Sequence, residues 1–246
     1  MFNQYINKVN QLMHVVEKEE QSNIKAAAEK MADCIQKNGI IHVFGCGHSH
    51  MLGEELFYRA GGLVPVNPIL IEDLMLHKGA IRSSALEQTN DYANEFMKEV
   101  HIQSGDILIV TSTSGRNPVP IDVALIAKKK GAFVIAITSP RYAENQSSRH
   151  KDGIFLFQAA DLMIDNHIEV GDILFTDEDH HLSYGSGSTI VGMTIVNGII
   201  SESISVMLEN QFRPPVFKSS NADGAGDHNQ RLIEMYKDRI PLLVKG

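Results

Sequence analysis

Cysteine, clustered basic residues and long apolar runs are all scarce in this chain of 246 residues, and each shortage excludes a class of protein. The two cysteines, Cys34 and Cys46, cannot form a disulfide framework and belong to no Cys-x-x-Cys pair, which predicts a reduced, intracellular compartment. The net charge of −8 argues against a nucleic-acid-binding surface, because phosphate backbones require clustered lysine and arginine.

Neither a signal peptide nor a membrane span is predicted. The first residues lack the basic and apolar regions that make up a signal peptide. No run approaches the ~18 apolar residues that are needed to cross a bilayer. We therefore expect a cytoplasmic protein without a membrane partner.

Apolar runs that alternate with amphipathic stretches predict an α/β protein, with a parallel sheet buried on both faces. The strands are expected at residues 40–44, 63–71, 107–111, 133–138 and 160–165. The helices are expected at residues 3–36, 49–60, 84–100, 121–130, 188–210 and 231–239. Residues 166–187 and 213–230 have the composition of polar loops. Because no linker or repeat is visible, one domain is expected over residues 1–246, with a core of about 30–210 and a C-terminal loop and short helix over 211–246.

Two short turns rich in serine and glycine follow two of the predicted strands. They are Gly45-Cys46-Gly47-His48-Ser49 and Ser112-Thr113-Ser114-Gly115. Each precedes a predicted helix, so hydroxyls and free backbone N–H groups gather at two helix N-termini, where phosphate is well accommodated. Neither turn is followed by a Walker lysine, which favours a small phosphorylated metabolite over a nucleoside triphosphate. A dinucleotide fingerprint competes for the first turn, but His50 stands where its third glycine is required.

The candidate ligand-binding residues come from three helix N-termini. They are Gly47, His48 and Ser49 in the first turn, Ser112, Thr113, Ser114, Gly115 and Asn117 in the second, and Ser188 and Thr189 before the last long helix. Simple capping of each helix is the alternative, but one cap needs one hydroxyl and the second turn offers three. For Ser188 and Thr189 capping and ligand binding are about equally well supported.

The second turn and its surroundings resemble a known family. The stretch Val110–Pro118, followed by a helix and Gly131–Thr138, resembles the sugar isomerase (SIS) domain, in which a Ser-x-Ser-Gly-x-Thr-type loop binds sugar phosphate. The first turn is similar to the family's first loop, and the resemblance covers about 30–210. It implies a three-layer sandwich around a five-stranded parallel, flavodoxin-like sheet, with N- and C-terminal helical extensions, in a homodimer or homotetramer.

Within this family the chain is most similar to a stand-alone group that is described by analogy with phosphoheptose isomerases. That group has a Ser-Gly-Arg-Asn-Pro loop and a late Asp-His-Asn segment, here Asp227-His228-Asn229. The resemblance implies an aldose–ketose isomerase acting on a sugar phosphate without a cofactor. Phosphoheptose isomerases carry their base in a Glu-Glu-Leu motif about ten residues after the first-loop serine. In this chain the motif Glu54-Glu55-Leu56 lies one helical turn closer to Ser49 than it does in those isomerases. The shared motif implies that Glu55 is the catalytic base.

Histidines in predicted loops are the candidates for a second catalytic group. Isomerisation needs groups that titrate near neutral pH, and His180 or His228 is expected to assist at the ring oxygen or carbonyl. The pairs His48-x-His50 and Asp179-His180-His181 could supply imidazoles to a metal, but no established metal-ligand spacing appears, so no metal is expected.

Two other functions remain open on the sequence alone. A non-catalytic sugar-phosphate sensor is one, although regulatory SIS proteins usually carry a DNA-binding helix-turn-helix and residues 1–36 are too short and too acidic for one. An etherase or lyase acting on an amino-sugar phosphate is the other, because the pair Ser188-Thr189 resembles the Ser-Thr pair of N-acetylmuramic acid 6-phosphate etherases.

Overall fold

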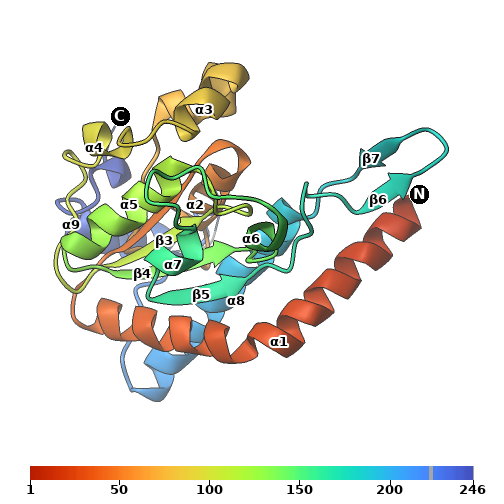
Figure 1. Cartoon of the computed structure of the whole chain (residues 1–246). Helices are drawn as coiled ribbons and strands as arrows, with labels where there is room; N and C mark the ends of the chain where they lie inside the picture. Colours follow the sequence, from red (N-terminus) through yellow and green to blue (C-terminus); the bar gives the residue numbers. More distant parts are fainter. Residues whose placement is uncertain (222–223, 246) are drawn as a thin grey trace.

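A five-stranded parallel sheet forms the centre of the computed structural model, which describes residues 1–221 and 224–245 (Figure 1). The spatial order of its strands is β2-β1-β3-β4-β5, and every neighbouring pair is parallel. The strands are β1 (Ile41–Gly45), β2 (Val66–Pro68), β3 (Ile107–Thr111), β4 (Phe133–Thr138) and β5 (Leu162–Asp165). The predicted α/β fold with a five-stranded parallel sheet is confirmed.

Helices cover both faces of this sheet, and a small antiparallel hairpin of β6 (Phe175–Asp177) and β7 (Leu182–Tyr184) stands apart from it (Figure 1). The α-helices are α1 (Phe2–Gln36), α2 (Met51–Leu56), α3 (Ala80–Glu87), α4 (Ala93–Phe96), α5 (Pro118–Lys129), α6 (Tyr142–Asn145), α7 (Leu156–Ala159), α8 (Ser188–Glu209) and α9 (Ala225–Tyr236). Short 3-10 helices are η1 (Gly47–His50), η2 (Glu72–Leu74), η3 (Leu76–Lys78) and η4 (Pro241–Leu243).

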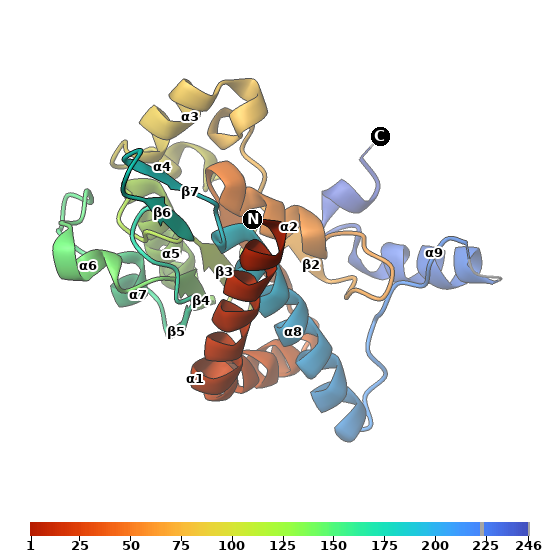
Figure 2. The same cartoon turned by 90° about the vertical axis from the view of Figure 1, so that its right-hand side faces the viewer.

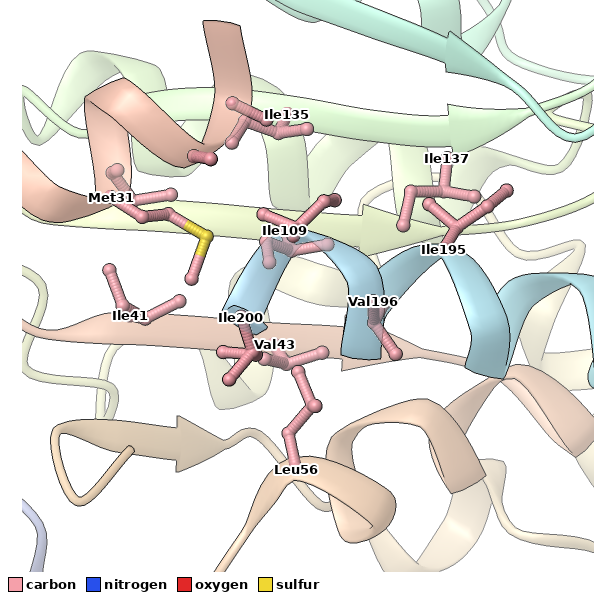
Figure 3. Close-up of a cluster of buried hydrophobic side chains, with 14 of the residues drawn as sticks. Met31, Ile41, Val43, Leu56, Ile109, Ile135, Ile137, Ile195, Val196 and Ile200 are labelled. Carbon is pink, nitrogen blue, oxygen red and sulfur yellow. The ribbon is translucent and has the colours of Figure 1, made fainter. Parts of the chain in front are cut away.

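One face of the sheet packs against α1, α2 and α8. Alternate residues of the strands, such as Ile41, Val43 and Ile109, point to this side because successive strand residues face opposite ways. Figure 3 shows them meeting Met31 of α1 and Ile195 of α8, all buried. Burial of these branched side chains on both faces explains why the strands read as continuous apolar runs in the sequence.

The opposite face packs against α4, α5 and α7. Phe44, Leu108 and Val110 of the sheet point to this side and meet apolar residues of α5 such as Val123. The helix α5 begins with proline, whose fixed φ suits the first turn, and ends in lysines that complement the helix dipole. Lys128 also pairs with Asp161, at 2.7 Å between Nζ and Oδ1.

Several element boundaries differ from those expected. The helix α1 begins one residue earlier than expected, at Phe2, and ends at Gln36 as expected. The helix predicted over 84–100 is divided into α3 and α4, because Asp91 between them adopts a left-handed φ of 66° and its N–H donates to the Asp122 carboxylate. The prediction of a loop over residues 213–230 is wrong in its last part, because the helix α9 begins at Ala225.

The apolar helix α8 also departs from expectation. It is long and apolar enough to cross a membrane by length and composition, with a mean hydropathy of 1.6 over its most apolar stretch, although no such run was expected. About 44% of that stretch is buried, and α8 packs along α1 and α2 (Figure 2). Its apolar residues therefore serve the core of this fold.

A buried ionic cluster ties the C-terminal segment to the amino-terminal edge of the sheet. Asp106, just before β3, accepts hydrogen bonds from the backbone N–H groups of Ile40 and Gln103 at 2.9 and 2.8 Å. Its carboxylate also contacts His42 Nε2 at 3.3 Å and Arg239 Nη2 at 2.6 Å. Burial acts to raise the pKa of Asp106, but the hydrogen bonds from His42 and the two N–H groups outweigh it and lower that pKa.

Candidate functional site

The two serine turns lie side by side at the carboxyl ends of β1 and β3. Gly45, the last residue of β1, is paired in register with Thr111, the last residue of β3. The strand order reverses at this pair, because the chain passes from β1 outward to β2 and then returns to β3. In open α/β sheets, ligands bind in the crevice at such a reversal.

The first turn folds back tightly over the end of β1. Thr111 Oγ1 donates to the Ser49 carbonyl at 3.0 Å, which ties this turn to the neighbouring strand. A Cβ on Gly45 would lie 2.5 Å from the Ser49 carbonyl carbon and 2.6 Å from Thr111 Oγ1, so no larger residue fits. Gly47 has a φ of 53°, the left-handed conformation that glycine adopts without strain. The position of Ser49 therefore depends on both glycines.

The second turn extends the edge of the sheet before it enters α5. The Ser112 N–H donates to the Ile137 carbonyl at 3.1 Å. Gly115 is left-handed, with a φ of 56°, and its N–H donates to Ser112 Oγ at 3.3 Å. A Cβ on Gly115 would lie 2.5 Å from Thr138 Oγ1, so the turn passes close to the end of β4. These contacts hold the turn in one conformation.

Several backbone N–H groups of the second turn find no acceptor among residues 1–221 and 224–245. They belong to Thr113, Ser114, Arg116, Asn117 and Val119. The proline at the first position of α5 contributes no N–H of its own. Unpaired N–H groups at a helix N-terminus suit an oxyanion where a ligand can reach them, because the helix dipole there favours negative charge. Val119 is fully buried, whereas Thr113, Ser114, Arg116 and Asn117 are partly exposed.

A small cavity of about 20 Å³ lies between the two turns and the start of α8. Its wall is formed by His48, Ser49, Leu52, Thr111, Ser112, Thr113, Ile137, Asn166, Ser188, Thr189 and Gly192. Six of the predicted binding residues therefore meet here: His48, Ser49, Ser112, Thr113, Ser188 and Thr189. A volume of this size holds about one water molecule, so an ion as large as phosphate does not fit inside it unless side chains of its wall move.

Two polar residues of this wall were missed from the sequence. The sequence pattern places Thr111 in a strand and Asn166 at the start of a polar loop, so neither is a candidate ligand-binding residue on the sequence alone. Asn166 is buried and its Nδ2 donates to Thr113 Oγ1 at 3.3 Å. The available signal was the position of Asn166 immediately after β5, since the carboxyl ends of parallel strands meet at one edge.

A larger concavity of about 710 Å³ follows the outer face of α8 and shares Thr189 with the small cavity. Asn197 lies in its wall and donates from Nδ2 to Glu55 Oε1 at 3.0 Å. The second oxygen of Glu55 pairs with Arg59 at 2.8 Å. The Glu55 carboxylate therefore reaches the edge of this concavity and does not line the small cavity.

The N-terminus of α8 already carries an anion. The Asp172 carboxylate accepts hydrogen bonds from the N–H groups of Gly187 and Ser188, both at 2.9 Å. It also accepts the Ser188 hydroxyl at 2.6 Å. Capping by Asp172, which lies 16 residues before Ser188, was not foreseen, and it occupies the donors that Ser188 was expected to give to a ligand.

The remaining predicted binding residues belong to the turns without lining the cavity. Gly47, Ser114 and Gly115 shape the backbone around it. Asn117, the N-cap residue of α5, uses its side chain elsewhere: Nδ2 donates to Glu87 Oε1 at 2.9 Å, and Oδ1 accepts from Arg149 Nη1 at 2.9 Å.

Both predicted catalytic histidines lie away from the small cavity. His180 is exposed in the turn of the β6–β7 hairpin, where Nδ1 and its N–H both contact Asp177 Oδ1 at 3.0 Å. His228 is on α9, and its Nε2 contacts the Val216 carbonyl at 2.9 Å. Figure 2 shows the hairpin and α9 on opposite sides of the molecule. One copy of the chain does not bring either imidazole to the serine turns.

Two carboxyl groups near the carboxyl edge of the sheet, the half-buried Glu87 and the buried Asp165, have raised pKa values. Burial raises the pKa of Glu87, against the hydrogen bond from Asn117 and the charge of Arg149. Burial also raises the pKa of Asp165, and the nearby Glu20 carboxylate acts in the same direction. Glu87 was not foreseen as part of this region, because it sits in a stretch expected to be a plain helix.

Metal-ligating side chains do not converge here. Across residues 1–221 and 224–245, no group of three or more His, Cys, Asp or Glu side chains is arranged to hold a metal ion. Burial raises the pKa of Cys46 in the first turn well above its ordinary value, with Glu87 as a second cause, so this thiol stays protonated.

Comparison with known proteins by family model, by sequence and by structure points to the SIS domain. A family model described as the SIS domain matches residues 4–139. A UPF0309 protein of Halalkalibacterium halodurans is 54% identical over 244 residues, which cover 99% of this chain and 98% of the relative. Among solved structures, the phosphoheptose isomerase of Neisseria gonorrhoeae aligns with a TM-score of 0.52 at 17% identity, covering 81% of this chain and 95% of that one. A phosphoheptose isomerase from Francisella tularensis aligns with a TM-score of 0.50 at 17% identity, covering 83% and 96%.

Proposed function

The chain belongs to the UPF0309 family of SIS-domain proteins, and on that premise we propose that it binds a sugar phosphate and interconverts its aldose and ketose forms. The observation that carries the proposal is the meeting of two serine turns at the strand-order reversal, with unpaired N–H groups at the start of α5. Such groups bind an oxyanion without a metal. The likeness to phosphoheptose isomerase structures supports the fold on which this site is built.

In the proposed complex the phosphate lies against Ser49 and the second turn, and the sugar extends past Thr189 toward the concavity along α8. That concavity has the volume of a small-molecule site. Glu55 is the proposed base, because its carboxylate meets Asn197 at the edge of this space. It takes the proton from C2 of the aldose as the C1 carbonyl oxygen gains one, which gives an enediol. Return of the carbon-bound proton to C1, with loss of the O2 proton, gives the ketose.

The second catalytic group is proposed to come from another copy of the chain. His180 and His228 lie too far from the turns to act within one copy, and the hairpin that carries His180 projects from the body (Figure 1). Leu182 and Tyr184 of this hairpin are 56% and 42% exposed, as apolar residues at an interface between copies would be in a separated chain. A homodimer or homotetramer fits this arrangement.

The function is tested by a thermal-shift screen of sugar phosphates, followed by NMR in deuterium oxide to detect exchange at the carbon beside the carbonyl. We expect a shift with at least one sugar phosphate, and deuterium incorporation that Glu55→Gln abolishes while binding persists. Glu54→Gln, at the neighbouring half-exposed glutamate, is the matched control. Binding without exchange across all hits would favour the sensor, and cleavage of an ether-linked amino sugar would favour the lyase.

A further inference from the structure

The hydroxyl groups around the small cavity differ in which part of each group already bonds within the protein. A hydroxyl has one hydrogen to donate and two lone pairs that accept. Where the protein uses the hydrogen, the group can only accept from a ligand; where the protein uses a lone pair, the hydrogen stays available. The bonds of Ser188, Ser112 and Thr113, which all line this cavity, therefore determine what each can offer.

Ser188, at the start of α8, can offer only lone pairs. Its Oγ lies 2.6 Å from Asp172 Oδ2, and an ionised carboxylate only accepts, so the Ser188 hydrogen is directed at Asp172. The other oxygen of Asp172 is held by the N–H groups of Gly187 and Ser188, both at 2.9 Å. Toward the cavity Ser188 is therefore an acceptor, and the charge of Asp172 behind it disfavours a phosphate oxygen at this wall.

The second turn offers hydrogens. Ser112 Oγ accepts the Gly115 N–H at 3.3 Å, and Thr113 Oγ1 accepts from Asn166 Nδ2 at 3.3 Å. The orientation of the Asn166 amide is fixed, because its Oδ1 accepts the Ile168 N–H at 3.2 Å. Neither hydroxyl of the turn donates to another residue within 1–221 and 224–245. Both hydrogens therefore remain for a group inside the cavity.

The size of the cavity selects the kind of group that can enter. Its volume of about 20 Å³ suits one water molecule or one hydroxyl group. A phosphate is larger and, when fully ionised, only accepts. A hydroxyl has the right size, and it can donate to one wall while it accepts from the other. Ser188 and Thr113 are both partly exposed, so a ligand can reach the space between them.

We propose that the small cavity is a subsite for one hydroxyl group of the sugar, which donates to Ser188 Oγ and accepts from the second turn, while the phosphate binds outside the cavity. Asp172 and Asn166 are positioning residues, which orient the Ser188 and Thr113 hydroxyls for this purpose. This inference rests on the proposed function. It adds a requirement on the substrate: the sugar carries a free hydroxyl at the position that enters the cavity.

The test is calorimetric titration with glucose 6-phosphate, fructose 6-phosphate, the monodeoxy analogues of both, and inorganic phosphate. For the wild type we expect one analogue to bind about tenfold more weakly than its parent, because the lost hydroxyl leaves polar groups of the cavity unpaired. In Ser188→Ala the parent should bind as weakly as that analogue, with little change for inorganic phosphate. Ser188→Thr keeps the hydroxyl and should restore the difference.

Asp172→Asn separates positioning from a merely structural role. The amide oxygen can keep both N–H bonds of the cap, and the amide nitrogen then donates to Ser188 Oγ, so the Ser188 hydrogen turns into the cavity. The difference between parent and analogue should disappear, while the melting temperature stays close to that of the wild type. A structural role alone would lower the melting temperature and leave the difference in place. Ser183→Ala, at an exposed serine of the β6–β7 hairpin, is the matched control.

The remaining outcomes are also decisive. If every deoxy analogue binds as tightly as its parent, or if Ser188→Ala keeps the wild-type difference, the inference is overturned while the proposed binding of a sugar phosphate stands. If the wild type binds inorganic phosphate but gains no affinity from either sugar, the inference is overturned as well. If it binds none of these probes, the proposed phosphate site fails and the inference fails with it.

Discussion

The close approach of Gly45 to Ser49 makes one substitution especially informative. In Gly45→Ala the new Cβ would lie 2.5–2.6 Å from the Ser49 carbonyl group and 2.6 Å from Thr111 Oγ1. Non-bonded contacts of this kind are favourable at about 3.5 Å, so the Ser49 backbone must move by roughly 1 Å. The Thr111 hydrogen bond to the Ser49 carbonyl, now 3.0 Å, is strained by the same movement.

The expected cost is about 2 kcal/mol of unfolding free energy, as for other overpacked sites, which corresponds to a melting temperature about 4–8 °C lower. The displaced Ser49 should weaken phosphate binding about tenfold or more, since a misplacement of about 1 Å has effects of this size in binding and catalytic sites. Thermal unfolding and calorimetric titration with phosphate measure the two effects.

A second glycine provides the control. A Cβ on Gly198 of α8 would have no heavy atom within 4 Å, so Gly198→Ala should keep phosphate affinity and gain up to about 1 kcal/mol of helix stability. If Gly45→Ala binds phosphate as tightly as the wild type, then Ser49 is not held in place by this contact or does not bind the ligand, and the proposed site is wrong.

Three further substitutions test other parts of the structure. Asp106→Asn leaves Arg239 and His42 without their buried carboxylate and should cost about 3 kcal/mol in urea unfolding. Because the pKa of Asp106 is lowered by folding, its contribution is present above the ordinary value of 3.8 and is lost as pH falls through the lowered pKa, so acid unfolding of the wild type should show a component that Asp106→Asn lacks. Asp172→Ala should cost about 2 kcal/mol by uncapping α8 yet bind phosphate more tightly, and unchanged affinity by calorimetry would remove Asp172 from the site. Gly198→Leu should leave the fold intact but shift the chain to monomer in light scattering if α8 faces another copy; an unchanged mass would place the interface elsewhere.

The layers of the fold were predictable because their physical cause is local. The strands β1, β3 and β4 are largely apolar runs bounded by glycine or polar turns, and burial on both faces favours such runs. Boundaries failed where a distant contact decided them. Asp91 ends α3 by donating to Asp122, 31 residues away, and the division of the predicted helix over 84–100 depends on that contact.

The candidate site was harder to predict from the sequence than the fold. A sequence shows which side chains can donate hydrogen bonds, but it does not show which of them already donate to another residue of the protein. Ser188 and Asn117 were both expected to give hydrogen bonds to a phosphate. Ser188 gives its hydroxyl and N–H to Asp172, whereas Asn117 is held by Glu87 and Arg149. The consequences differ: at α8 the protein's own carboxylate fills the helix end, whereas at α5 the Asn117 side chain bonds to residues outside the helix. Two helix N-termini that look alike in sequence therefore differ in their capacity for an anion, and the difference is set by side chains 16 to 32 residues away.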